Sequence, residues 1–525
     1  MRWFLFAWLV TIPAAFVPHP TPLHAAEPVI PHTSAGLVIK EFFDVIASGD
    51  ADKARTFLTT RYTEEALAAR PVESRMEGWR NLMADLARPT LLEVSLTPGR
   101  PRLVIESGQS GEVFQVVLEQ QTEAPYKVSG VRMQPTIPGR PEIPPGPLTD
   151  AVRTQLINEL IDKLVAEDRF YGVVMVAKDG KPFVERAAGM ASQSFQAPNR
   201  IDTKFCLGSM NKMFTSLAIA RLVQDGKLSY QDKVGRHLPD FPNVDVRDKV
   251  TIHHLLTHTS GLGSYFDDPE YMANWINMRR VADYTTAVAN EKLEFEPDAR
   301  MSYSNSGFIV LGLIIEKVSG QDYYDYVKAN VFRPAGMSDS DSYENDQVVP
   351  NLAIGYTAIQ DIPMAEKSTV RHANLYQHSA RGTPAGGGHS TAPDLLKFDR
   401  ALRSGSIVSK ALVDTVTSAK VPMGPGVGYG YGFGDFRGRG DGYYGHNGGA
   451  PGMSTDFRVY DRLGYTVIVL SNYDGVAASV ADFIDELIVP PPPLPPPGSM
   501  GPPPSAPGGP APPPPSSPPP PVRRP

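Results

Sequence analysis

A serine and a lysine separated by two residues could form a nucleophile and its base. Ser209 precedes Lys212 at what the sequence predicts to be the start of a helix. Residues three apart lie on one helical face, so the hydroxyl can meet the amine. A serine needs a partner base, and a lysine in an apolar setting can lose its proton near neutral pH. The helix N-terminus would add N–H groups where an oxyanion forms.

A tyrosine and an asparagine two residues apart form a second motif. Tyr303 and Asn305 lie in the segment 301–307, which is rich in serine. A phenol can take and return a proton if nearby cations lower its pKa. An asparagine amide can orient a lysine and hold a substrate carbonyl. Taken alone, the motif is also typical of a surface loop.

A histidine followed by two glycines forms a third motif. His446 stands just before Gly448 and Gly449, ahead of a predicted strand that begins at Thr455. Glycines let the backbone approach a ligand closely and leave N–H groups free. We therefore predict that both glycines contact the substrate, and that an N–H near Gly449 pairs with that of Ser209 as an oxyanion hole. A plain glycine-rich turn is the alternative.

Two longer stretches are predicted to hold this site from behind. Residues 255–262 read Leu-Leu-Thr-His-Thr-Ser-Gly-Leu, and residues 384–395 are rich in glycine. In the second stretch, Thr391 and Asp394 are spaced as a helix cap, and Pro393 suits a first helical turn. Both stretches are interpreted as architectural.

The elements that must position these residues indicate an α+β fold. Strands at the start and at the end of the segment 148–489 enclose a mostly helical middle. We therefore predict an antiparallel sheet built from both ends and flanked by helices, with an all-helical region. The predicted elements are a helix over 149–166, strands over 172–177, 182–187, 455–460 and 465–470, and a helix over 477–488.

The three motifs, in this order and with the two longer stretches between them, resemble the serine β-lactamase and penicillin-binding-protein-like family. The resemblance covers residues 149–489. It is to the branch with class C β-lactamases, D-alanyl-D-alanine carboxypeptidases, D-aminopeptidases and related esterases. The class A branch carries Ser-Asp-Asn and Lys-Thr-Gly where this chain has Tyr-Ser-Asn and His-Asn-Gly.

This resemblance implies acyl transfer. Ser209 would be the nucleophile and Lys212 its activator, and Tyr303 would act as general base and acid with Asn305 positioning. His446 would stand where many relatives have a lysine, whose fixed charge holds a substrate carboxylate. Because histidine is only partly charged near pH 7, this departure argues against a dedicated β-lactamase.

We expect a serine hydrolase that acts on amides or esters through an acyl-enzyme, of carboxypeptidase-like or esterase-like type. The substrate would be a small molecule or peptide, such as a muropeptide, a β-lactam or an ester, and no cofactor or metal is implied. The alternative is a non-catalytic sensor or scaffold of the cell envelope, since a fold does not fix a function.

Other nucleophiles and metals are less well supported. Cys206 is the single cysteine and is interpreted as a small buried hydrophobe. His254 and His258 are one helical turn apart, but the His-Glu-x-x-His pattern of zinc enzymes is missing. The chain also lacks a Gly-x-Ser-x-Gly elbow, which counts against an α/β-hydrolase.

Composition and the first residues indicate an exported protein. A net charge of −7 over 525 residues gives no nucleic-acid footprint, and one cysteine excludes an internal disulfide. Arg2 precedes an apolar run over 3–17, and small residues follow at 25–26. Residues 1–26 therefore predict a signal peptide, and we expect a bacterial periplasmic location.

The remaining segments predict a second folded part and two proline-rich connections. Residues 31–137 are expected to form a small α+β domain whose element order resembles the nuclear-transport-factor-2-like fold. A semi-rigid linker over 138–147 and a disordered tail over 490–525, with possible cell-wall contact, follow from proline density. In the domain we predict helices over 35–46 and 50–57, and strands over 92–96, 102–105, 112–118 and 126–131.

Overall fold

A computed structural model describes residues 28–96, 98–108, 113–144, 146–357, 371–424 and 426–489. The predicted signal peptide and the predicted proline-rich tail lie outside these residues. Within the described ranges, each helix is too short or too polar to cross a lipid bilayer.

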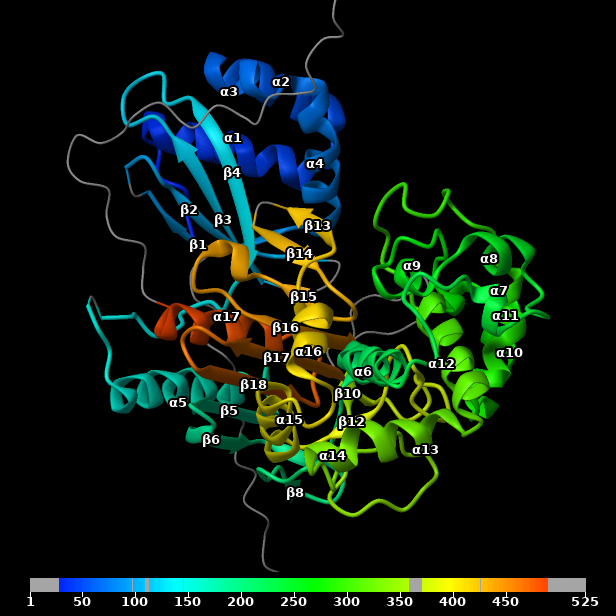
Figure 1. Cartoon of the computed structure of the whole chain (residues 1–525). Coiled ribbons are helices and arrows are strands. Elements are labelled where there is room, and N and C mark those ends of the chain that lie inside the picture. The colour runs from blue at the N-terminus through cyan, green and yellow to red at the C-terminus, as the bar shows by residue number, and fades with distance from the viewer. Residues whose placement is uncertain are drawn as a thin grey trace, which may run out of the picture. The chain divides into compact units, whose positions relative to one another are not determined.

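Four helices and a four-stranded antiparallel sheet make up the first part of the chain (Figure 1). Thr33 and Asp50 cap the first two helices, because their side-chain oxygens accept hydrogen bonds from free backbone N–H groups. The elements are α1 (Ser34–Ser48), α2 (Ala51–Arg61), α3 (Glu64–Ala69), α4 (Val72–Asp85), β1 (Thr90–Ser95), β2 (Arg102–Glu106), β3 (Val113–Gln120) and β4 (Val128–Pro135).

This first part has a hydrophobic core of its own, drawn from residues between Val38 and Val128. Phe42, Phe57 and Trp79 pack against one another at its centre. The predicted helices correspond to α1 and α2, and the four predicted strands to β1–β4. Helices α3 and α4 were not expected. The likeness to the nuclear-transport-factor-2-like fold stays a prediction.

An eight-stranded antiparallel sheet lies at the centre of the following part. Its order is β13-β14-β15-β16-β17-β18-β5-β6, so the last strand of the chain pairs with the first strand of this part. The predicted sheet built from both ends is thereby confirmed. The strands are β5 (Gly172–Lys178), β6 (Lys181–Ala188), β13 (Val421–Gly424), β14 (Val427–Tyr429), β15 (Gly434–Asp435), β16 (Tyr444–Ala450), β17 (Met453–Tyr460) and β18 (Tyr465–Ser471).

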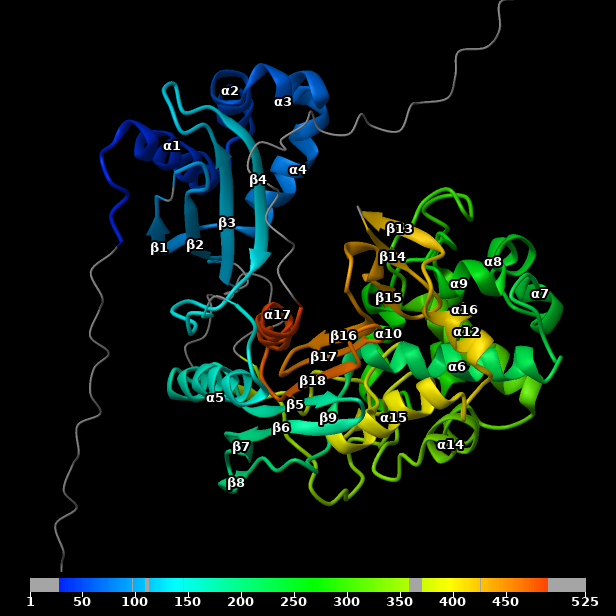
Figure 2. The same ribbon diagram turned by 60° about the vertical axis from the view of Figure 1, so that its left-hand side comes forward.

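The central strands are buried on both faces because helices cover the sheet from both sides. In β5, Val173 and Met175 belong to one hydrophobic core, while Val174 and Val176 belong to the other. Figure 2 shows α5 and α17 on one side, and α6 and α15 on the other. These helices are α5 (Asp150–Ala166), α6 (Asn211–Gln224), α15 (Ala392–Ser404) and α17 (Ala477–Ile488).

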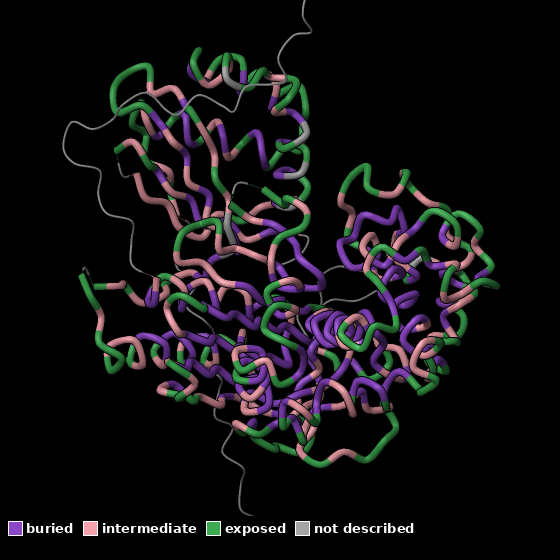
Figure 3. Tube along the Cα trace, in the orientation of Figure 1, coloured by how far each residue is buried: buried purple, intermediate pink, exposed green. Residues whose placement is uncertain are grey.

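The predicted all-helical region is present and packs around two almost completely buried helices, α6 and α12 (Figure 3). Short strands and 3₁₀ turns connect this region to the sheet. The helices are α7 (Val234–His237), α8 (Val244–Lys249), α9 (Ile252–Leu256), α10 (Pro269–Asn274), α11 (Thr285–Asn290), α12 (Ser306–Ser319), α13 (Tyr323–Val327), α14 (Arg333–Ala335) and α16 (Lys410–Thr417). The short strands are β7 (Met190–Ser192), β8 (Ala197–Pro198), β9 (Phe205–Cys206), β10 (Tyr356–Thr357), β11 (His372–Ala373) and β12 (His389–Ser390).

Candidate active site

Ser209 lies in a tight 3₁₀ turn, η1 (Gly208–Met210), between β9 and α6. Gly208 has a φ of 53°, in the left-handed region that glycine adopts without strain. A Cβ at this position would lie 2.9 Å from the backbone nitrogen of Gly449. The turn that carries Ser209 is therefore pressed directly against strand β16.

Lys212 is fully buried in the first turn of α6, and its Nζ has three hydrogen-bond partners. These partners are Ser209 Oγ at 3.3 Å, Asn305 Oδ1 at 2.8 Å and the carbonyl oxygen of Ala385 at 2.6 Å. Burial lowers the pKa of Lys212 well below its usual value, because the charged amine would lose its hydration. The site therefore favours the neutral amine.

The hydrogen-bond partners of Lys212 agree with a neutral amine. Such an amine has two N–H groups and one lone pair. Asn305 Oδ1 and the Ala385 carbonyl can only accept, so they take both N–H groups. The lone pair is left for the proton of the Ser209 hydroxyl, and Lys212 can act as its base.

Tyr303 and Asn305 immediately precede α12. The Asn305 amide is held at both ends, because its Oδ1 accepts from Lys212 and its Nδ2 donates to Ser264 Oγ at 3.0 Å. The Tyr303 ring keeps 44% of its surface exposed, and its centroid lies 4.7 Å from Lys212 Nζ. Desolvation raises the pKa of Tyr303, and contact with Ser209 offsets only part of this rise. The phenol is therefore protonated, whereas the sequence-based interpretation required cations to lower its pKa.

His258 accepts hydrogen bonds from the backbone on both sides of Tyr303. Its carbonyl oxygen accepts from the Ser302 N–H at 2.8 Å, and its Nδ1 accepts from the Ser304 N–H at 3.1 Å. Its ring lies 4.3 Å from the Tyr303 ring, and its backbone has a φ of 60°. The stretch 255–262, predicted to be architectural, thus supports Tyr303 from both sides.

His446 lies in β16, buried next to Tyr429. Its Nδ1 is 2.5 Å from the carbonyl oxygen of Asn447, which cannot donate, so Nδ1 must carry the proton. Its Nε2 then accepts from the Tyr429 hydroxyl at 3.0 Å. Burial lowers the pKa of His446 to about 4. The imidazole is therefore neutral near pH 7, whereas the sequence suggested a partly charged one.

Gly448 and Gly449 belong to strand β16, so the alternative of a glycine-rich turn is wrong. A Cβ on Gly448 would collide with the carbonyl oxygen of Leu207, whereas a Cβ on Gly449 would meet open space. Of the three motif residues, Gly449 lines the cleft that is described below. His446 and Gly448 are not among the described residues that line this cleft. The structure brings Gly449 against the Ser209 turn, and the oxyanion pairing stays a prediction.

Ser209 opens into a cleft of about 1150 Å³ that Tyr303, Asn305 and Gly449 also line. One wall is aromatic and includes Tyr265, Phe266 and Trp275. Trp275 faces the cleft and also packs against the hydrophobic core.

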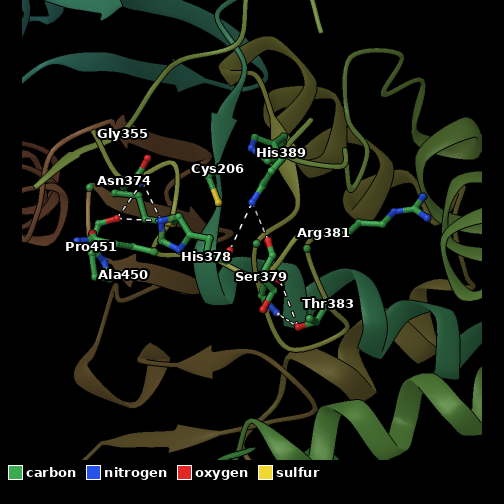
Figure 4. A pocket seen from close by; sticks show the side chains of 18 of the residues that line it. Cys206, Gly355, Asn374, His378, Ser379, Arg381, Thr383, His389, Ala450 and Pro451 are labelled. Atoms are coloured by element: carbon green, nitrogen blue, oxygen red, sulfur yellow. Dashed lines mark hydrogen bonds between the residues drawn. The ribbon is translucent and has the colours of Figure 1, made fainter. Parts of the chain in front are cut away.

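Another part of the cleft lining is polar. Figure 4 shows Asn374 and His378 meeting at the carbonyl oxygen of Pro451, with distances of 2.8–3.0 Å. Ile354 and Gly355 also belong to this lining. The serine therefore faces a cleft with one aromatic side and one hydrogen-bonding side.

Cys206, expected to be a small buried hydrophobe, is half-buried and lies in the cleft wall. It is the cross-strand partner of His389, and Figure 4 shows the two side chains next to each other. Burial raises the pKa of the Cys206 thiol to about 11, so the thiolate nucleophile is disfavoured. No group of three metal-ligating side chains occurs within the described ranges.

Three functional contacts were missed from the sequence. Ala385 fixes Lys212 through its carbonyl oxygen, Ser264 fixes Asn305, and Tyr429 fixes the tautomer of His446. A backbone carbonyl leaves no signal in a sequence. Ser264 and Tyr429 lie far from their partners along the chain, so spacing could not reveal them.

The comparisons with known proteins agree with this geometry. A family model described as "Beta-lactamase" matches residues 157–487. The chain therefore belongs to the β-lactamase family, a family of serine hydrolases, as the sequence motifs indicated.

Individual relatives match a similar share of the chain. Penicillin-binding protein 4* of Bacillus subtilis (strain 168) is 33% identical over 336 residues, which are 60% of this chain and 71% of that protein. The penicillin binding protein structure from Bacillus halodurans has a TM-score of 0.57 and 31% identity, and the match covers 62% of this chain and 98% of that one. EstCE1, a hydrolase with promiscuous acyltransferase activity, has a TM-score of 0.53 and 25% identity over 65% of this chain and 98% of its own.

Proposed function

We propose that the chain cleaves an ester or amide bond through an acyl-enzyme on Ser209, as an esterase-like or D-alanyl-D-alanine carboxypeptidase-like hydrolase. The observation that carries this proposal is the buried Lys212, whose two N–H groups are held by Asn305 and Ala385. Its lone pair is left for Ser209 at 3.3 Å, which is the arrangement that an activated serine needs.

The proposed reaction has two halves. In the first, Ser209 Oγ forms a bond to the substrate carbonyl carbon while its proton moves to Lys212. The protonated Tyr303 gives a proton to the leaving group as its bond breaks, and it is reprotonated from Lys212. Backbone N–H groups of Ser209 and Gly449 would hold the oxyanion. In the second half, water forms a bond to the acyl carbon while its proton moves to Lys212. The bond to Ser209 Oγ then breaks, Oγ regains the proton from Lys212, and the acid is released.

The comparisons support this proposal without fixing the substrate. One relative is a penicillin-binding protein and another is a hydrolase with acyltransferase activity. Peptide, β-lactam and ester hydrolysis can share one nucleophile and one base, and the cleft walls would select among them.

The proposal is tested by the intact mass of the purified protein after incubation with a penicillin or with a neutral fluorophosphonate. We expect a covalent adduct with at least one reagent, and none with Ser209→Ala. A folded wild-type protein that neither reagent modifies would overturn the proposal and favour a non-catalytic sensor. An adduct that persists in Ser209→Ala would also overturn it.

The fate of the penicillin separates the subtypes. A lasting adduct indicates a carboxypeptidase-like enzyme, and intact drug without an adduct indicates an esterase or peptidase. Destroyed drug without an adduct indicates a β-lactamase.

We also propose that the protein is exported to the bacterial periplasm. The support is the sequence pattern of residues 1–26, which has a positive start, an apolar run and small residues at its end. N-terminal sequencing of protein from a periplasmic extract should begin near Glu27. Protein that stays in the cytoplasmic fraction with its first residues intact would contradict this location.

A further inference from the structure

The charged groups that line the cleft are already engaged by the protein. Arg381 is the one lysine or arginine among the described lining residues. Its Nε donates to the carbonyl oxygen of Ser342 at 2.8 Å, and its guanidinium lies 3.5 Å from the centroid of the Tyr324 ring. In Figure 4 this guanidinium points away from Asn374 and His378. The Arg381 guanidinium is therefore engaged by Ser342 and Tyr324, and it is directed away from the Asn374 and His378 side of the cleft.

Glu344 carries the negative charge of the cleft lining. It is the one Asp or Glu among the described lining residues, and it lies between Arg279 and Arg381. Arg279 also pairs with Asp346, so two carboxylates face the two arginines and neither arginine is left over for a ligand. Its histidines apart, the described lining thus offers no spare positive charge to a substrate carboxylate.

His446, at the position where a charge beside the nucleophile was expected, also lacks a charge. His446 has its Nδ1 hydrogen committed to the Asn447 carbonyl and its Nε2 lone pair committed to the Tyr429 hydroxyl. A neutral imidazole with both nitrogens occupied can neither attract nor donate to a carboxylate. Lys212, the nearest amine, directs its N–H groups to Asn305 and Ala385.

Exposed apolar side chains gather at the same cleft. Phe266 and Met272 keep 45% and 61% of their surfaces exposed, and Leu375 and Tyr376 keep 52% and 81%. Exposed large apolar groups that cluster around one cavity mark a site for an apolar ligand. Phe266 rests on the rings of Tyr265 and Tyr271, so its wall is supported from behind.

We propose that the cleft takes an uncharged ester or amide whose acyl part is a bulky apolar group, and that it rejects substrates with a carboxylate next to the scissile bond. This inference rests on the proposed function of Ser209 and narrows it to the esterase-like form, because a carboxypeptidase substrate carries a carboxylate next to the scissile bond. A carboxylate entering this lining would lose its hydration without gaining a cation, which is unfavourable. An aromatic or long acyl group would instead cover the Phe266 and Met272 wall.

Matched esters test the charge selectivity. The probes are the phenyl and meta-carboxyphenyl esters of phenylacetic acid, assayed at about pH 8, where unshifted histidines are neutral. We expect kcat/KM to favour the phenyl ester by at least about tenfold after correction for hydroxide hydrolysis. Equal or faster turnover of the carboxyphenyl ester would overturn the inference.

Substitutions in the wall test the apolar selectivity. The double variant Phe266→Ala/Met272→Ala should lower kcat/KM for phenyl octanoate relative to phenyl acetate by about tenfold. Met423→Ala is the matched control, because Met423 is also an exposed apolar residue but lies outside the described lining. A wall variant that keeps the octanoate preference of the wild type would contradict the inference.

A covalent label separates failure of this inference from failure of the proposed function. The neutral fluorophosphonate should modify Ser209 in the wild type and in both variants. If it modifies Ser209 but the carboxyphenyl ester is turned over faster, the substrate class alone is wrong. If it leaves Ser209 unmodified in the folded protein, the proposed function is wrong as well.

Discussion

Lys212 controls the proposed chemistry at the scale of single residues, because its proton must be absent before Ser209 can lose its own. Burial lowers the pKa of Lys212, and only the neutral form has a lone pair. The neutral fraction grows with pH, so kcat/KM should rise with pH on the acid side of the profile.

Lys212→Arg and Lys212→Met provide the test of this role. Arginine keeps its proton at any accessible pH, and methionine has no basic nitrogen. Each variant should lose about a hundredfold to ten-thousandfold in kcat/KM and lose the acid limb of the pH–rate profile. If the acid side of the pH–rate profile is unchanged in a folded Lys212→Met protein, the titrating group is not Lys212.

His258 is expected to act through Tyr303 as a positioning residue. Its Nδ1 accepts from the Ser304 N–H, and asparagine can place an oxygen near that point and tolerates a positive φ. We expect kcat to fall in the order wild type, His258→Asn, His258→Ala, with KM nearly unchanged. Steady-state kinetics on folded variants measure this, and equal losses in both variants would indicate that the hydrogen bond is unimportant.

Residue identities at the site could be predicted from sequence, but their electrostatic states could not. Ser209, Lys212, Tyr303 and Asn305 lie together in the structure, and their catalytic roles stay predictions. The raised pKa of Tyr303 depends on how much protein surrounds its hydroxyl, and spacing does not contain that quantity. The same holds for the neutral His446, whose partner Tyr429 comes from a different strand.

Strand β16 allows a prediction at the scale of the elements, because its two glycines face different surroundings. A methyl group on Gly448 would collide with the Leu207 carbonyl, which belongs to the segment leading into Ser209. Gly448→Ala should therefore lower the free energy of unfolding by about 1–3 kcal/mol. Urea denaturation measures this difference.

Gly449→Ala is the matched substitution, since a Cβ there meets open space next to the serine. It should leave stability nearly unchanged but reduce kcat/KM, because the methyl group enters the cleft. A Gly449→Ala protein as active as the wild type would argue against an approach of substrate over this strand.

Element boundaries were predictable where pattern and capping agree. Helix α17 spans the predicted residues 477–488, and Thr391 caps α15 as expected. Helix α4 was missed because it begins after Pro71 without a side-chain cap and contains Gly78. The short strands β9 and β12 were missed because two residues give no alternating pattern.

Buried histidines give a prediction at the scale of the whole molecule. Burial lowers the pKa of His258, and it lowers those of His389 and His446 to about 4, from an unfolded value of 6.5. Between these values the unfolded chain binds more protons than the folded one. The free energy of unfolding should therefore fall as pH drops from 6.5 towards 4, by an amount on the order of 1 kcal/mol per histidine at about pH 5.

Urea unfolding midpoints at about pH 7 and pH 5 measure this dependence. His389→Gln should flatten it, since glutamine does not titrate. If substitution of the buried histidines leaves the pH dependence of unfolding unchanged, the acid sensitivity arises from other groups.

The pairing of β18 with β5 has a consequence for synthesis. Ser471 donates to the carbonyl oxygen of Tyr171, and these residues are 300 positions apart. The ribosome makes Ser209, Lys212 and Tyr303 long before the strand that closes the sheet. A chain stopped before β18 carries the reactive residues but lacks the sheet that holds β16 against them. The sheet that holds β16 beside the Ser209 turn can therefore close only after the residues of β18 have been made.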